Sequence, residues 1–245
     1  AGAGPGRPDG RRADGGRAMT AVDVETRAPD LRWRGRTLAA VLLPVGPAAV
    51  AVLRFVMPYK TVDDSTAIVH QVAAHQSAES AVVWLGFLAT LTLVPGVLAV
   101  GKVARASAPR LTAAALALVV PAYLCIGWLV SSDAAVLFSV RHGLSTSVAA
   151  DSYESIHPVA LVAGVVFVVG HVVGTVLLGC ALLRVDAVPQ VAAVAVLVSQ
   201  PLHFVAAVIL GSHGLDLFAW GLNAAGFAAV GLLVLRMSDR EWAGA

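Results

Sequence analysis

The sequence predicts an all-α fold: a polytopic membrane bundle of six transmembrane helices with both termini in the cytoplasm. Hydrophobic residues make up 58% of the 245 residues and charged residues only 13%, about half the charged fraction of a soluble domain. The apolar residues are grouped into runs long enough to cross the hydrocarbon core as helices. Lysine and arginine gather on one side of these runs, which sets the orientation of the chain.

Each apolar run is expected to be a helix, because unpaired backbone groups in lipid cost several kcal/mol. The alternating pattern of a membrane β-barrel strand is absent. Prolines interrupt four of the runs internally; they can kink a helix but are common in transmembrane helices. The six predicted spans are residues 37–57, 81–101, 111–131, 158–183, 189–210 and 215–236.

The basic residues place both termini on the cytoplasmic side of a bacterial plasma membrane. Nine lysines and arginines flank the spans on the side of the N-terminus, and three lie on the other side. The nine are Arg32, Arg34, Arg36, Lys102, Arg105, Arg110, Arg184, Arg236 and Arg240, and the three are Arg54, Lys60 and Arg141. Cytoplasmic flanks carry this excess in membrane proteins.

The chain divides into three parts. Residues 1–36 are predicted to be a disordered basic N-terminal tail, since they are rich in Gly, Arg, Ala and Asp without apolar periodicity. We interpret residues 1–18, which precede Met19, as an upstream extension without a structural role. Residues 37–236 form the predicted six-helix transmembrane domain, and residues 237–245 form a short cytoplasmic C-terminal tail.

Two long connections are predicted on the outer side, at residues 58–80 and 132–157. Each contains a short helical pattern after a capping candidate, Asp64 or Ser65 in the first and Asp133 in the second. Five histidines are assigned to outer loops, four of them in these two connections, and their spacing matches no zinc or copper pattern. These are His70, His75, His142, His157 and His213. Cys125 and Cys180 differ too much in depth to form a disulfide.

Polar side chains fall near one depth of the predicted bundle. His171 interrupts the apolar run VVFVVGHVVGTVLLG between two glycines in a GxxxG pattern, and such a face packs against another helix. We expect His171 to donate or accept a hydrogen bond there. Gln200 and His203 on the fifth span and Asn223 on the sixth complete the layer. The layer is either a glue between helices or a site for a ligand or proton.

Three ionisable residues lie at the outer ends of the spans: Arg54, Glu79 and Asp216. Arg54 is expected to extend toward the lipid headgroups. Alternatively, it pairs with Glu79 or Asp216, and the pair then forms the charge-selective mouth of an outward-facing cavity. Asp216 can also be favoured by the dipole of its own helix.

No cofactor is predicted. Haem or a metal ion held by His171 and His203 is an alternative, but helices adjacent in sequence pack 8–10 Å apart, which leaves little room for a porphyrin. The sequence has no CxxCH for covalent haem, no P-loop, no GxSxG and no lysine in the middle of a span.

A weak, pattern-level resemblance covers about residues 38–236. The segment VDDSTAIVHQVAAH, the stretch WLGFLATLTLVPGVLAV and the run APRLTAAAL resemble an uncharacterised family of six-span integral membrane proteins of high-GC bacteria. The resemblance implies a membrane protein of that class and no functional residues.

The first functional hypothesis is a membrane protein that is not an enzyme. It binds or passes a small molecule, a lipid or a proton through an outward-facing polar cavity. One alternative is a membrane-embedded enzyme, which would be a haem or metal redox protein or a lipid-modifying enzyme that uses Glu79 or Asp216 as proton donor. The other alternative is a structural or partner-binding membrane subunit. Its partners are the lipid bilayer, a small-molecule or lipid ligand, and a second copy or a partner membrane protein. A net charge of +2 gives no reason to expect nucleic acid.

Overall fold

The computed structural model describes residues 2, 32–154 and 157–244, and the secondary structure of this part is helical throughout. Six helices are long and apolar enough to cross a membrane, which confirms the predicted all-α class and the six spans. They are α1 (Arg32–Val56), α3 (Gln76–Arg105), α4 (Pro109–Arg141), α6 (Val159–Leu182), α7 (Gln190–Phe204) with its π-helical continuation η1 (Val205–Ile209), and α8 (His213–Arg236).

The predicted disordered tail lies outside the described residues, apart from residue 2 and its last five residues. At those five the prediction is wrong, because α1 already begins at Arg32. The chain from 32 to 36 contains no proline and joins directly to the apolar run, so the helix continues back into the basic segment.

The outer connections differ from the prediction in one place. Asp64 caps α2 (Ser65–Ala74) as predicted, and its side chain accepts a hydrogen bond from the backbone N–H of Ala67 at 2.8 Å. Asp133, however, caps no separate helix: α4 runs through it to Arg141, since no proline or glycine interrupts residues 128–141. The second short helix is instead α5 (Thr146–Glu154), which follows a left-handed turn at Gly143 (φ 69°).

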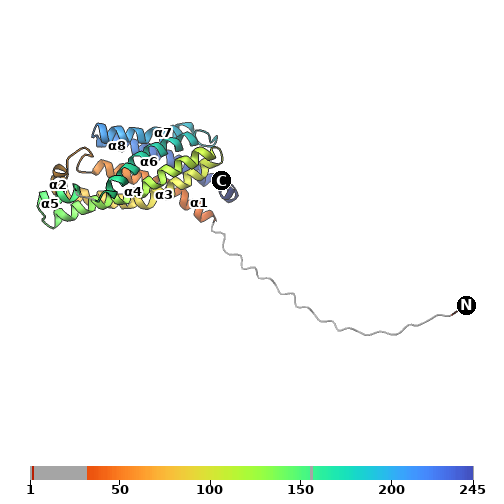
Figure 1. Cartoon of the computed structure of the whole chain (residues 1–245). Helices are drawn as coiled ribbons and strands as arrows, with labels where there is room; N and C mark the ends of the chain where they lie inside the picture. Colours follow the sequence, from red (N-terminus) through yellow and green to blue (C-terminus); the bar gives the residue numbers. More distant parts are fainter. Residues whose placement is uncertain (1, 3–31, 155–156, 245) are drawn as a thin grey trace. The chain divides into compact units, whose positions relative to one another are not determined.

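The long helices form a closed ring in the order α1, α3, α4, α6, α7, α8, and α8 packs back on α1. Figure 1 shows α2 and α5 side by side at one end of these helices. We call this the α2–α5 end. The short α3–α4 and α6–α7 connections, residues 106–108 and 183–189, lie at the opposite end, which we call the short-loop end.

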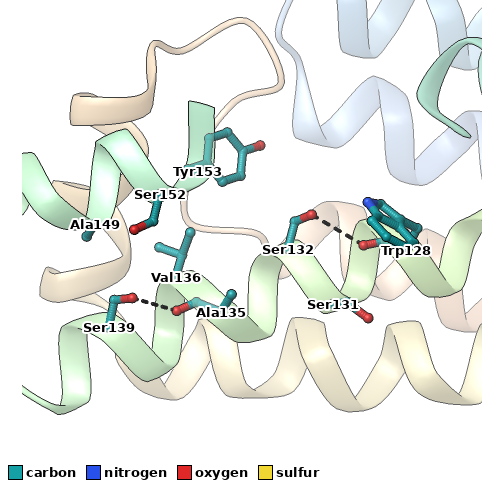
Figure 2. Close-up of a pocket in the computed structure, with 9 residues that line it drawn as sticks. All are labelled: Trp128, Ser131, Ser132, Ala135, Val136, Ser139, Ala149, Ser152 and Tyr153. Carbon is teal, nitrogen blue, oxygen red and sulfur yellow. Dashed lines mark hydrogen bonds between the residues drawn. The ribbon is translucent and has the colours of Figure 1, made fainter. Parts of the chain in front are cut away.

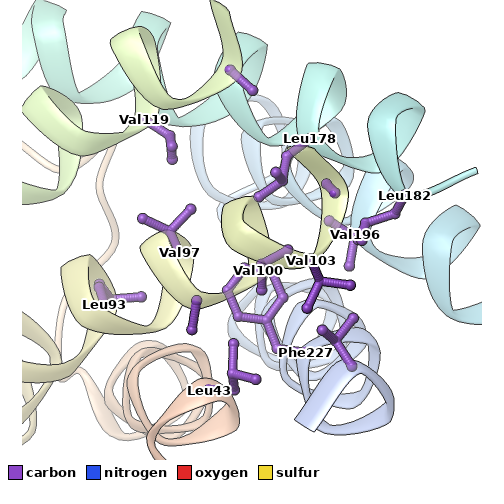
Figure 3. Packing of buried hydrophobic residues seen from close by; sticks show 14 of the residues in the cluster. Leu43, Leu93, Val97, Val100, Val103, Val119, Leu178, Leu182, Val196 and Phe227 are labelled. Atoms are coloured by element: carbon purple, nitrogen blue, oxygen red, sulfur yellow. The ribbon is translucent and has the colours of Figure 1, made fainter. Parts of the chain in front are cut away.

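Glycines bring the helices close together toward the short-loop end. A Cβ atom on Gly170 would lie 2.6 Å from the carbonyl oxygen of Leu118 in α4, and one on Gly179 would lie 2.6 Å from the Cα of Leu197 in α7. The GxxxG face of α6 therefore packs on α4, as a small-residue face does. Figure 3 shows the apolar side chains that fill the centre of the bundle, among them Leu43, Leu93, Val100, Leu178 and Phe227.

The predicted C-terminal tail contains a short helix, α9 (Asp239–Gly244). Arg36 in the first turns of α1 forms a 3.0 Å ion pair with Asp239, and it donates to the carbonyl oxygens of Val234, Leu235 and Met237. Lys102 lies over the ring of Trp242 at 4.6 Å. These contacts fasten α9 to the short-loop end.

Candidate functional site

A buried chain of three side chains joins α1, α8 and α7. Arg54 Nε lies 2.5 Å from one carboxylate oxygen of Asp216, and His203 Nδ1 lies 2.5 Å from the other. Asp216 is only 1% exposed. The expectation that Arg54 reaches the headgroups is wrong, because its guanidinium is held by Asp216, by Thr61 at 2.6 Å and by Met57 at 3.0 Å.

Local structure explains why these residues meet. His203 lies at the end of α7 and Asp216 in the first turn of α8, and the chain reverses between them at Gly211 (φ 58°), a conformation that glycine adopts without strain. His213, which the sequence assigned to a loop, is the first residue of α8. Its Nδ1 lies 2.7 Å from the carbonyl oxygen of Arg54 and ties the two helix ends together.

The carboxylate fixes which nitrogen of His203 carries the proton. An ionised carboxylate only accepts hydrogen bonds, so Nδ1 of His203 donates to Asp216, and in a neutral imidazole the Nε2 atom is then an acceptor. In the described part of the chain, no residue makes a hydrogen bond to that Nε2 atom. Asp216 is therefore satisfied on both sides, and His203 has one free nitrogen.

Three rings surround this histidine. The ring centroids of His171 and Trp220 lie 5.3 Å and 5.4 Å from that of His203. His171 also stacks on Phe167 at 4.2 Å and its Nδ1 lies 2.5 Å from the carbonyl oxygen of Phe167, in its own helix. The predicted hydrogen bond to a neighbouring helix is wrong: within the described residues, His171 Nε2 is buried without a partner.

The predicted polar layer divides into separate groups. Asn223 lies close to Tyr123 and Thr175 instead of joining His203, although no pair of their atoms reaches hydrogen-bond geometry. Gln200 is fully buried, and neither atom of its amide has a partner in the described residues. The sequence correctly predicted that these residues are buried inside the bundle. It did not predict which of their side chains face each other.

A second polar group lies nearer the α2–α5 end. Tyr59 donates to Asp133 at 2.5 Å, and Ser65 donates to Glu154. Glu79 is fully buried beside Asp133, and neither of its oxygens has a partner among the described residues. Burial, with the charges of Asp133 and Glu79, raises the pKa of Tyr59 well above its usual value, so the phenol stays protonated as a donor.

A cavity of about 540 Å³ connects the two polar groups. It lies among α1, α3, α4, α6, α7, η1 and α8, and α2 and α5 also contribute to its lining. Arg54 and His203 line it, whereas the other predicted site residues, Glu79, His171, Gln200, Asp216 and Asn223, lie outside its lining. Sequence reasoning missed Tyr59, Asp133, Tyr153 and Glu154, which line the cavity. Asp133 was overlooked because it was taken for a helix cap.

A smaller cavity of about 190 Å³ adjoins the first between α4 and α5, and the two share Trp128, Ser132 and Tyr153 (Figure 2). Its α4 serines donate to carbonyl oxygens of their own helix, as Ser132 does to Trp128 and Ser139 to Ala135. Their hydroxyl oxygens remain acceptors. The smaller cavity therefore extends the polar end of the larger one.

The geometry of the two membrane histidines does not fit haem. Axial imidazoles hold a porphyrin between them, but the ring centroids of His171 and His203 are only 5.3 Å apart, which leaves no room for a porphyrin between the two rings. In the residues that the structure describes, no three His, Cys, Asp or Glu side chains gather as metal ligands, and Cys125 and Cys180 are free thiols, as predicted.

No protein-family model, curated protein or solved structure matches this chain. The site is therefore interpreted from its own geometry.

Proposed function

We propose that this chain is a multi-pass protein of the bacterial plasma membrane that binds or passes a small molecule in an outward-facing cavity. The six apolar helices support a membrane location. The short-loop end carries Lys102, Arg105, Arg110 and Arg184 in or beside its connections, and the positive-inside rule supports a cytoplasmic position for that end and for both termini. The α2–α5 end then faces outward.

The observation that carries the proposal is the cavity that reaches His203. Its volume falls in the range of small-molecule sites, about 300–1,000 Å³. At its inner end, His203 offers a free acceptor nitrogen, backed by Asp216 and Arg54. Such a chain can bind a donor group of a ligand, and it can take up a proton without leaving an isolated charge.

The polar layer does not have the character of a purely structural glue. A glue would be saturated with hydrogen bonds, but the amide groups of Gln200 and Asn223 are buried and have no hydrogen-bond partner among the residues that the structure describes. Unsatisfied buried polar groups are costly and are retained where a function requires them.

A membrane-embedded enzyme is the second candidate, and the Asp216–His203 pair is the observation that favours it. A carboxylate that orients an imidazole, with Nε2 facing a cavity, is the arrangement of a general base. In the described residues, however, no hydroxyl or thiol lies within hydrogen-bond distance of that Nε2 atom. Binding is therefore preferred to catalysis.

Thiol labelling tests the outward-facing cavity. In a chain with Cys125→Ser and Cys180→Ser, cysteine is introduced at Ala207, which lines the cavity. Intact cells are treated with a membrane-impermeant cationic methanethiosulfonate reagent. Ala207→Cys is expected to be labelled from outside, whereas Ala206→Cys, which is buried and does not line the cavity, is not. If Ala207→Cys reacts only after denaturation, the proposal is wrong.

A further inference from the structure

We infer that the cavity takes a lipophilic organic cation with a single positive charge. This inference rests on the proposed binding function and names its ligand class. It is carried by the aromatic lining of the cavity, by its unbalanced negative charge and by its apolar wall.

Aromatic rings are concentrated in the cavity. The chain has only fifteen Phe, Trp and Tyr residues, and five of them line this one cavity. They are Tyr59, Trp128, Tyr153, Phe167 and Trp220. The faces of such rings attract cations, by about 0.5–2 kcal/mol each, and most strongly where water is excluded.

The charges around the cavity are predominantly negative. Asp133 and Glu154 line it. Among the described lining residues Arg54 is the one lysine or arginine, and its charge is already balanced by Asp216. The hydrogen bonds from Tyr59 and Ser65 stabilise Asp133 and Glu154 without bringing any positive charge.

Glu79 is a buried carboxyl group near Asp133 that lies outside the cavity lining. Its side chain is 0% exposed, and both oxygens lack a hydrogen-bond partner in the described part of the chain. A buried carboxyl group without a partner is costly. The negative charge that a cation would meet in the cavity therefore comes from Asp133 and Glu154.

The remaining wall favours a ligand that dissolves in the bilayer. Leu161 and Val168 of α6 and Val208 of η1 line the cavity and are also 74%, 36% and 41% exposed on the surface of the bundle. In the described residues α6 packs along α7 but not along η1. Gly164, which also lines the cavity, has open space where a Cβ would be. The gap between α6 and η1 is a route from the lipid.

Two ions of the same shape and opposite charge test the inference. Protein in zwitterionic nanodiscs is dialysed against radiolabelled tetraphenylphosphonium or against tetraphenylborate. Saturable binding of tetraphenylphosphonium, with little binding of tetraphenylborate, is expected. Asp133→Asn should weaken the phosphonium binding about tenfold, since 1.4 kcal/mol corresponds to a factor of ten. Asp151→Asn, an exposed control on α5, should not.

Aromatic and steric variants complete the test. Trp128→Leu should weaken binding, whereas Trp84→Leu, which is 71% exposed and lines neither cavity, should leave it unchanged. Gly164→Leu should block binding, because its side chain would project into open space and not into a packed helix. This variant keeps the test decisive if Asp133→Asn does not fold.

The outcomes separate this inference from the proposed function. The cation assignment would be overturned if tetraphenylborate binds as well as tetraphenylphosphonium. It would also be overturned if neither Asp133→Asn nor Gly164→Leu weakens the binding of tetraphenylphosphonium. If Ala207→Cys is labelled from outside but tetraphenylphosphonium does not bind, only the ligand class is wrong. If Ala207→Cys is not labelled, the outward-facing cavity itself is wrong, whatever the phosphonium result.

Discussion

Toward the short-loop end, glycines of α6 bring that helix into backbone contact with α4 and α7, whereas toward the α2–α5 end the same ring of helices leaves a cavity of about 540 Å³. The contrast is visible within α6 alone. A Cβ on Gly170 would lie 2.6 Å from a carbonyl oxygen of α4, while a Cβ on Gly164 would meet nothing within 4 Å. A glycine therefore permits close packing but does not produce it.

The two regions also differ in what holds the helices together. Toward the short-loop end the contacts are mainly apolar, so van der Waals packing of small residues suffices. Around the cavity, α1, α7 and α8 are joined by the charged chain of Arg54, Asp216 and His203. The open region thus depends on a few strong polar contacts, and single substitutions there should have large effects.

The largest effect is expected for Asp216→Asn. It leaves the partly buried Arg54 without its counter-charge, and it replaces one of the two carboxylate oxygens by an amide donor, so Arg54 and His203 cannot both keep their acceptor. Removing one partner of a buried pair costs about 3–5 kcal/mol, so the free energy of unfolding in detergent should fall by about that amount. Asp239→Asn makes the same change in the half-exposed pair with Arg36. There the free energy of unfolding should fall by only about 0–1 kcal/mol.

A double-mutant cycle shows whether the loss of stability in Asp216→Asn comes from the broken ion pair with Arg54. Arg54→Gln combined with Asp216→Asn should be less destabilised than the sum of the single variants, because neither charge is then left alone. If Asp216→Asn is no worse than Asp239→Asn, the charged chain does not hold the open region together.

Gly170→Ala and Gly164→Ala are expected to change the free energy of unfolding by smaller amounts, and in different directions in the two regions. The first should lower the free energy of unfolding by about 1–3 kcal/mol, because the new methyl group overlaps the backbone of α4. The second should leave it unchanged or raise it by up to about 1 kcal/mol, the gain in helix propensity from glycine to alanine. Thermal unfolding in one detergent compares them directly, and equal effects would contradict the contrast between the regions.

Much of this fold is readable from the sequence, because apolar runs and bilayer thickness determine it. The six spans and the cap at Asp64 follow from local composition. The end of α4 does not, since Asp133 looks like the cap of a separate helix, although residues 132–141 contain no proline or glycine that would stop the preceding one. Boundaries between a span and its extension depend on tertiary contacts, which a local pattern does not contain.

The sequence predicted several residues of the candidate site but not how they pair. Polar residues inside a membrane span are energetically unfavourable and therefore indicate a functional site. Arg54, His203 and Asp216 were predicted for this reason. Which of them pair depends on helix rotation and on the reversal at Gly211, which spacing along one helix does not give. The aromatic residues of the cavity carry no such signal, since Phe, Trp and Tyr are ordinary in a membrane span and at its edges.

The smallest effect concerns the ionisation of Tyr59 at the mouth of the cavity. The difference in absorbance near 295 nm between wild type and Tyr59→Phe isolates this phenol during an alkaline titration. Its pKa is raised chiefly by burial and then by Asp133 and Glu79, so it should ionise well above the usual value of about 10. In the Asp133→Asn background the midpoint should move down, because one negative charge is removed, yet burial should keep it above the usual value.

The sign of the accompanying change in stability follows from linkage. The folded pKa of Tyr59 lies above the unfolded one, so its contribution to stability is complete below pH about 10 and is lost as the pH rises through the folded pKa. Tyr59→Phe, which cannot ionise, should therefore lose less stability than wild type between neutral pH and that range. A phenol that titrates at its usual value would mean that the mouth is open to water and not enclosed by the carboxylates.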